Sequence, residues 1–158
     1  MMQNGIITVN VKAGRVYCLN VLGRGDFSLD IDWGQGCSCP PDGRYLVQGN
    51  LRKEEASARY WFESSLPPIS LPEGVVNSIN FAGQIAPHRF WTTDRDKKRA
   101  SFFVSVSGDE SLLVVATKPQ HIRMLEKVST PPSCAGIAIM RGFGDGWRLE
   151  ASILKFVS

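Results

Sequence analysis

Residues 26–33 read DFSLDIDW and alternate apolar with polar side chains. Every second position from Phe27 to Trp33 is apolar, and the positions between them are serine or aspartate. Successive side chains of a β-strand point to opposite faces, so this spacing predicts a strand with one buried face and one acidic, solvated face.

The sequence on both sides continues this pattern. Residues 6–11 and 15–22 are rich in β-branched and aromatic side chains and flank a turn whose Gly14 suits a positive φ, which predicts a hairpin. Further strands are expected at 44–48, 75–81, 88–93, 100–106, 112–117, 136–140 and 147–157. Residues 120–128 predict a helix, because Pro119 precedes them and Thr130-Pro131-Pro132 follows.

Two segments between the expected strands have less regular sequences. Residues 50–63 could form a helix capped by Asn50, but they lack a continuous apolar stripe, so we favour a hairpin that turns at 53–56. Residues 66–74 contain three prolines and predict an extended connector inside one domain. The sequence therefore predicts a single mainly β domain over residues 1–158, a β-sandwich or barrel of about ten short strands with one or two short helices.

Composition excludes several classes of protein. Of the 158 residues, 43% are hydrophobic and 21% are charged, which is the balance of a globular chain rather than a disordered one. No apolar run approaches the roughly 20 residues that a membrane helix needs. The first residues, MMQNG, lack the basic and apolar regions of a signal peptide. We therefore predict a cytoplasmic protein without a membrane partner.

Positive charge is concentrated in one short stretch. The net charge of the chain is +3, and residues 88–99 (HRFWTTDRDKKR) carry five positive and two negative charges. The interleaved aspartates favour a solvated polar loop, so nucleic acid is not predicted as a partner. A phosphate-binding patch is the alternative, because Phe90 and Trp91 stand beside the charges and could stack on bases.

No motif for catalysis or for metal binding is present in the sequence. Cys37 and Cys39 are one residue too close for a C-x-x-C zinc knuckle, and no second tight pair follows them. The glycines at 142–146 lack the strand–turn–helix context of a dinucleotide loop. We therefore predict no catalytic residue, no metal and no cofactor, and expect free, mostly buried cysteine thiols.

Aromatic and charged side chains supply the candidate contacts. Trp91 stands in polar surroundings, where a tryptophan can line a pocket or anchor an interface. The acidic face could meet the 88–99 stretch of a second copy of the chain. The ligand or interface candidates are Trp91, His88, Arg89, Asp94, Trp33 and Asp30.

One family resemblance accompanies this pattern. Residues 24–33 (RGDFSLDIDW) and 43–53 (GRYLVQGNLRK) resemble the opening strands of small phage tail β-sandwich domains. The resemblance covers about a quarter of the chain and consists of strand-forming positions. It supports a sandwich and implies a structural, phage-type assembly module as one possible role.

Together these features predict a non-enzymatic binding protein, whose partner is a small apolar or aromatic ligand or a second copy in a homodimer or higher oligomer. One alternative is an enzyme with a pocket near His88, Arg89 and Asp94 in a β-barrel. The other alternative is the assembly module.

Overall fold

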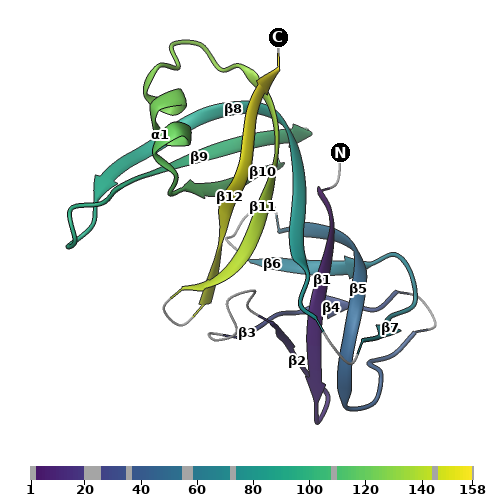
Figure 1. Cartoon of the computed structure of the whole chain (residues 1–158). Helices are drawn as coiled ribbons and strands as arrows, with labels where there is room; N and C mark the ends of the chain where they lie inside the picture. The colour runs from purple at the N-terminus through teal and green to yellow at the C-terminus, as the bar shows by residue number, and fades with distance from the viewer. Residues whose placement is uncertain are drawn as a thin grey trace.

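The protein is described by a computed structural model that covers residues 3–19, 26–34, 37–54, 59–71, 74–107, 110–143 and 146–157. Within these ranges twelve strands form one sheet, and one helix lies beside it (Figure 1). The elements are β1 (Gln3–Lys12), β2 (Arg15–Cys18), β3 (Phe27–Ser28), β4 (Ile31–Asp32), β5 (Gly43–Lys53), β6 (Tyr60–Ser64), β7 (Ile69–Ser70), β8 (Asn77–Thr92), β9 (Lys98–Ser107), β10 (Glu110–Ala116), α1 (Pro119–Glu126), β11 (Ser133–Phe143) and β12 (Gly146–Val157).

This architecture confirms the predicted mainly β fold. The acidic stretch forms β3 and β4, and its burial alternates as expected, with Phe27 and Leu29 buried and Ser28 and Asp30 exposed. The predicted hairpin at the N-terminus is β1 and β2, and Gly14 in its turn has φ 79°. The helix expected at 120–128 is α1, which buries Ile122 and Leu125.

The ambiguous segment 50–63 is a hairpin and not a helix. β5 and β6 pair antiparallel from Gly49 with Ser64 to Lys53 with Tyr60, while residues 55 and 56 of the expected turn lie outside the described residues. The separate strands expected at 75–81 and 88–93 instead form one strand, β8. Its pairing with β9 shifts register between Pro87 and Arg89, so a bulge carries the strand past a proline that has no N–H to donate.

Five strands of the second half of the chain close into a barrel. β8 pairs with β9, β9 with β10, and β11 with both β12 and β8, all antiparallel. β10 and β12 pair in parallel and complete the ring. The helix α1 connects β10 to β11, so the chain leaves the ring after its third strand and returns to it through the helix.

The first half of the chain repeats this strand order. β1 pairs with β2 and β5, β2 with β3, and β5 with β6, again antiparallel. β4 and β6 pair in parallel, as β10 and β12 do in the second half. Leu29 and Asp30 join β3 to β4 and continue the ladders, because Leu29 N–H donates to Val16 O at 3.1 Å and Phe62 N–H donates to Asp30 O at 2.9 Å. We call the two rings the first barrel and the second barrel.

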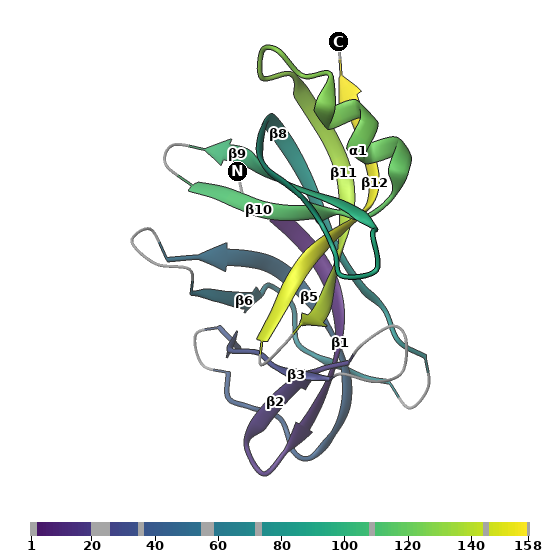
Figure 2. The same ribbon diagram turned by 90° about the vertical axis from the view of Figure 1, so that its left-hand side faces the viewer.

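The two barrels are joined through their first strands (Figure 2). β1 and β8 pair antiparallel from Gly5 with Ile79 to Ile7 with Asn77. A Cβ at Gly5 would lie 2.6 Å from Ser78 O, so this close approach of the two strands requires glycine. Near the joint, the Trp147 ring of β12 lies 5.8 Å from Phe27 and 5.3 Å from Tyr60 of the first barrel.

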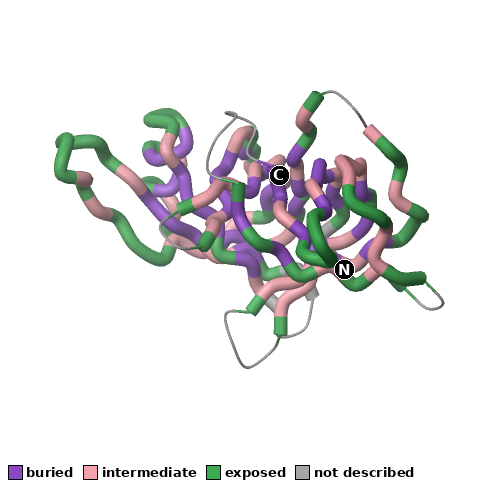
Figure 3. The backbone as a smooth tube through the Cα atoms, turned by 90° about the horizontal axis from the view of Figure 1, so that it is seen from below, coloured by how far each residue is buried: buried purple, intermediate pink, exposed green. Residues whose placement is uncertain are grey.

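The buried apolar side chains form one cluster that extends through both barrels, from Ile7 to Leu154. In Figure 3 the buried segments, drawn in purple, occur in both barrels. That the whole chain is one domain stays a prediction. No helix among the described residues is both long and apolar enough to cross a membrane.

Candidate functional site

The outer part of the β8–β9 hairpin extends beyond the second barrel (Figure 1, left). We call residues 88–99 the basic arm. Its strands are held in register by pairs such as Trp91 with Arg99. Its turn is fixed through Thr93, whose N–H donates to Lys97 O at 2.9 Å and whose Oγ1 accepts from Lys97 N–H at 3.2 Å. The arm is therefore an ordered hairpin, in which the polar loop expected over 88–99 is confined to the turn at 93–97 and strands β8 and β9 flank it.

Aromatic rings and cations lie side by side on the arm. The Arg89 guanidinium lies 5.3 Å from the centre of the Trp91 ring, within the range of a cation–π contact. Phe90 is 47% exposed. The His88 ring meets the edge of Phe103 at 4.7 Å and so packs against the barrel wall. The arm therefore offers flat apolar surfaces next to positive charge.

Two cations of the arm lie on a strand, apart from the acidic residues of its turn. Asp94 and Asp96 lie in the turn, whereas Lys98 and Arg99 lie on the strand β9. Lys97 and Lys98 are exposed, and neither forms an ion pair with any residue that the structure describes. The lysines therefore remain available to an anionic ligand.

A groove of about 640 Å³ lies between the arm and α1. A smaller hollow of about 220 Å³ shares four of its lining residues and adds the aromatic side of the arm. The helix contributes Pro119, Ile122, Arg123 and Glu126, whose spacing places them on one helical face. The arm contributes Lys97, Lys98 and Arg99.

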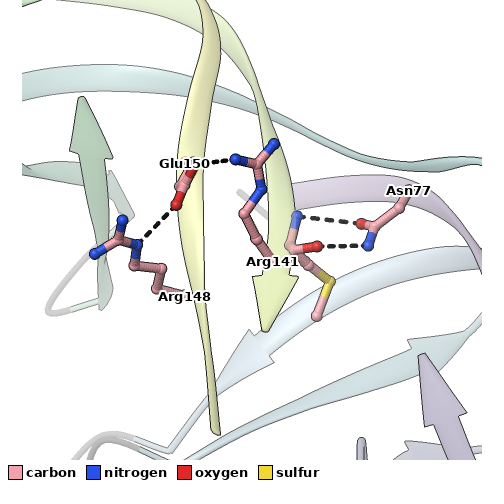
Figure 4. A network of polar contacts seen from close by, with 5 residues as sticks. Asn77, Arg141, Arg148 and Glu150 are labelled. Atoms are coloured by element: carbon pink, nitrogen blue, oxygen red, sulfur yellow. Dashed lines mark hydrogen bonds and ion pairs between the residues drawn. The ribbon is translucent and has the colours of Figure 1, made fainter. Parts of the chain in front are cut away.

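The β11–β12 turn of the second barrel carries a similar pair of side chains. Phe143 is 60% exposed, and the Arg148 guanidinium lies 4.1 Å from its ring centre. Arg148 Nε also donates to Glu150 at 2.8 Å, and Arg141 lies 3.0 Å from the same carboxylate (Figure 4). Two arginines thus share one buried glutamate, which fixes their orientation and leaves an excess of positive charge.

The predicted candidates divide between the two barrels. His88, Arg89, Trp91 and Asp94 all belong to the arm, whereas Trp33 and Asp30 line a groove of about 470 Å³ on the first barrel. Asp30 lies 3.4 Å from Arg59 and is part of an ion pair of its own barrel. The six candidates therefore do not form one site.

The cysteines do not form a site either. Cys18 and Cys134 are buried, and burial raises the pKa of the Cys18 thiol to about 12 and that of Cys134 to about 11. Cys37 is exposed and Cys39 is half-buried. The expectation of mostly buried thiols therefore holds for two of the four cysteines. No group of three or more metal-ligating side chains occurs among the described residues.

The second barrel is a closed ring whose third and fifth strands are parallel and whose helix precedes the fourth strand. The chain is similar in fold to single-stranded DNA binding proteins. It matches the wild-type protein of this name from Thermus aquaticus with a TM-score of 0.71 and 12% identity, over 99% of this chain and 93% of that chain. A deletion mutant of the same protein matches with a TM-score of 0.71 and 11% identity, over 99% and 95%. No family model and no curated protein matches the sequence.

This likeness corrects two predictions made from the sequence. The first is the function, predicted as binding a small apolar ligand or a second copy, with an enzyme or a phage-type module as alternatives. The second is the expectation that nucleic acid is not a partner. The second relied on a charge count along the sequence, in which Asp94 and Asp96 diluted the positive charge of the arm. In the folded hairpin these aspartates occupy the turn, beside the basic strand rather than within it.

Sequence reasoning also missed several residues of this region. Arg123 and Glu126 were not considered, although both line the groove. The spacing of 119, 122, 123 and 126 is the signal that could have indicated one helical face. Phe143 and Arg148 were missed because they lie on different strands, and the sequence does not show which side chains come into contact across a turn.

Proposed function

We propose that the protein binds single-stranded DNA through its second barrel. The observation that carries the proposal is the arm, an ordered hairpin on a barrel similar to single-stranded DNA binding proteins, with aromatic rings beside unpaired lysines. In five-stranded barrels of this class, the loops between strands 1 and 2 and between strands 4 and 5 contact oligonucleotides. These loops correspond to the arm and to the β11–β12 turn.

The chemistry of these two turns suits an unpaired strand. Exposed lysines can neutralise the phosphates, and the release of counterions drives binding. Phe90, Trp91 and Phe143 offer faces on which unstacked bases can stack, which contributes about 1–3 kcal/mol per base without sequence preference. Bases inside a duplex do not expose these faces, so the same surface favours single strands.

The two barrels differ in charge, which supports the assignment to the second. Residues 1–76 carry seven positive and eight negative charges, whereas residues 77–158 carry eleven positive and seven negative charges. The net charge is thus −1 for the first part and +4 for the second. Phosphates are attracted mainly to the second barrel. A cytoplasmic location, as predicted from the sequence, is part of this proposal.

The proposal is tested by fluorescence anisotropy with a labelled thymidine oligonucleotide and the matching duplex. We expect binding of the single strand at 0.1 M salt, a steep loss of affinity as salt rises, and weaker binding of the duplex. Equal affinity for both forms would indicate an electrostatic surface without base stacking. No binding of the single strand at low salt would refute the proposed function.

A further inference from the structure

We propose that the groove between the basic arm and α1 holds one nucleotide of the bound strand, so that the helix is part of the DNA-binding surface. This inference rests on the proposed function and adds a site to it. The groove has a volume of about 640 Å³. That volume falls within the ~300–1,000 Å³ range of pockets that bind small ligands.

The lining of the groove has the two properties that a nucleotide needs. Four cations, Lys97, Lys98, Arg99 and Arg123, border it and can contact a phosphate. Pro119 is exposed and adds apolar surface beside the buried Ile122, and the adjoining hollow of about 220 Å³ brings in Phe90 and Trp91. A phosphate can therefore contact the cations while the base of the same nucleotide lies against Phe90 or Trp91.

The positive charge of the groove comes from two separate elements. Three cations belong to the arm, whereas Arg123 projects from the helix across from them. The ion pairs among the described residues do not include Arg123, so its charge is available. A ligand that contacts both elements must enter the groove, whereas one on the outer side of the arm would not touch the helix.

Among the residues that the structure describes, Glu126 is the one acidic side chain that lines the groove and the adjoining hollow. A carboxylate there repels a phosphate, so it lowers the affinity for DNA while the four cations raise it. The site therefore makes opposite predictions for two residues less than one helical turn apart. Loss of Arg123 weakens binding, and neutralisation of Glu126 strengthens it.

The experiment measures the affinity of three variants of the full chain for a labelled thymidine oligonucleotide at 0.1 M salt. We expect Arg123→Ala to weaken binding about fivefold and to lower the salt slope by about 0.7, the value for one phosphate contact on a single strand. We expect Glu126→Gln to strengthen binding about threefold. Lys127→Ala is the matched control, because Lys127 is exposed at the end of the same helix and does not line the groove.

The outcomes separate this inference from the proposed function. The inference is supported if Arg123→Ala weakens binding, Glu126→Gln strengthens it and Lys127→Ala leaves it within about twofold of the wild type. It is overturned if wild-type protein binds the oligonucleotide but Arg123→Ala and Lys127→Ala have the same effect, or if Glu126→Gln does not strengthen binding. A gain of affinity cannot result from misfolding, so Glu126→Gln remains informative even if Arg123→Ala unfolds. Failure of the wild type to bind overturns both proposals.

Discussion

Charge reversal on the basic arm, by Lys97→Glu together with Lys98→Glu, is expected to weaken binding of a single-stranded oligonucleotide at least about 25-fold at 0.1 M salt. Two phosphate contacts are lost, and each contributes about 0.7 logarithmic units at this salt concentration. Repulsion by the new carboxylates adds to the loss. Both lysines are exposed, so the fold should be preserved. Anisotropy titrations at several salt concentrations measure the affinity and its salt slope together.

The first barrel offers a matched control for this variant. Lys12 and Arg15 are exposed beside the turn of the β1–β2 hairpin, which occupies the same place in its barrel as the arm does in the second. Lys12→Glu with Arg15→Glu changes the net charge by the same amount, and we expect it to weaken binding only a few-fold. Equal losses in the two variants would show that overall charge attracts the DNA, and that the arm has no special part.

Replacement of Asn77 by alanine is expected to lower the free energy of unfolding by about 3 kcal/mol. Asn77 is buried, and its side chain donates to Met140 O at 2.7 Å and accepts from Met140 N–H at 3.2 Å (Figure 4). Its Nδ2 also lies 3.4 Å from Leu19 O in the first barrel. Since the backbone of Asn77 pairs with β1, this one residue links both barrels at their joint. Its loss leaves two buried backbone groups of Met140 without a partner.

Asn80→Ala is the control for this effect. Asn80 lies on the same strand, but it is exposed and donates only to Asn4 Oδ1 at 3.0 Å. We expect Asn80→Ala to change the free energy of unfolding by less than about 0.5 kcal/mol. Urea unfolding followed by tryptophan fluorescence measures both variants. Similar stability of the two variants would show that the Asn77 contacts do not hold the joint.

The local part of the fold could be predicted from the sequence. The alternation at 26–33, the Gly14 turn and the hairpin over 50–63 are all set by neighbouring residues, and the structure confirms each. The closure of each ring could not be predicted in this way. It depends on parallel pairs, β4 with β6 and β10 with β12, whose partners are far apart in the sequence. The repeat of the strand order was also missed, because the two halves share their topology but no sequence repeat of fixed period.

The candidate site could be predicted only where its residues are neighbours in the sequence. Trp91, Arg89 and His88 were selected from the composition of one stretch, and they do lie together on the arm. Trp33 and Asp30 were added to them, but they belong to the other barrel. The role of the charges depends on which residues fall in the turn and which on the strand. A count along the sequence does not distinguish these positions, so it led to the wrong partner.

Photocrosslinking reports where the DNA lies, so it tests whether the second barrel binds it. Wild-type protein is irradiated with a thymidine oligonucleotide that carries 5-iododeoxyuridine, and the crosslinked peptides are identified by mass spectrometry. We expect crosslinks at Phe90 and Trp91 of the arm, with Phe143 of the β11–β12 turn as a further position, since exposed rings stack on bases. Crosslinks confined to the first barrel, at Trp33 or Trp61, would contradict the assignment of DNA binding to the second barrel.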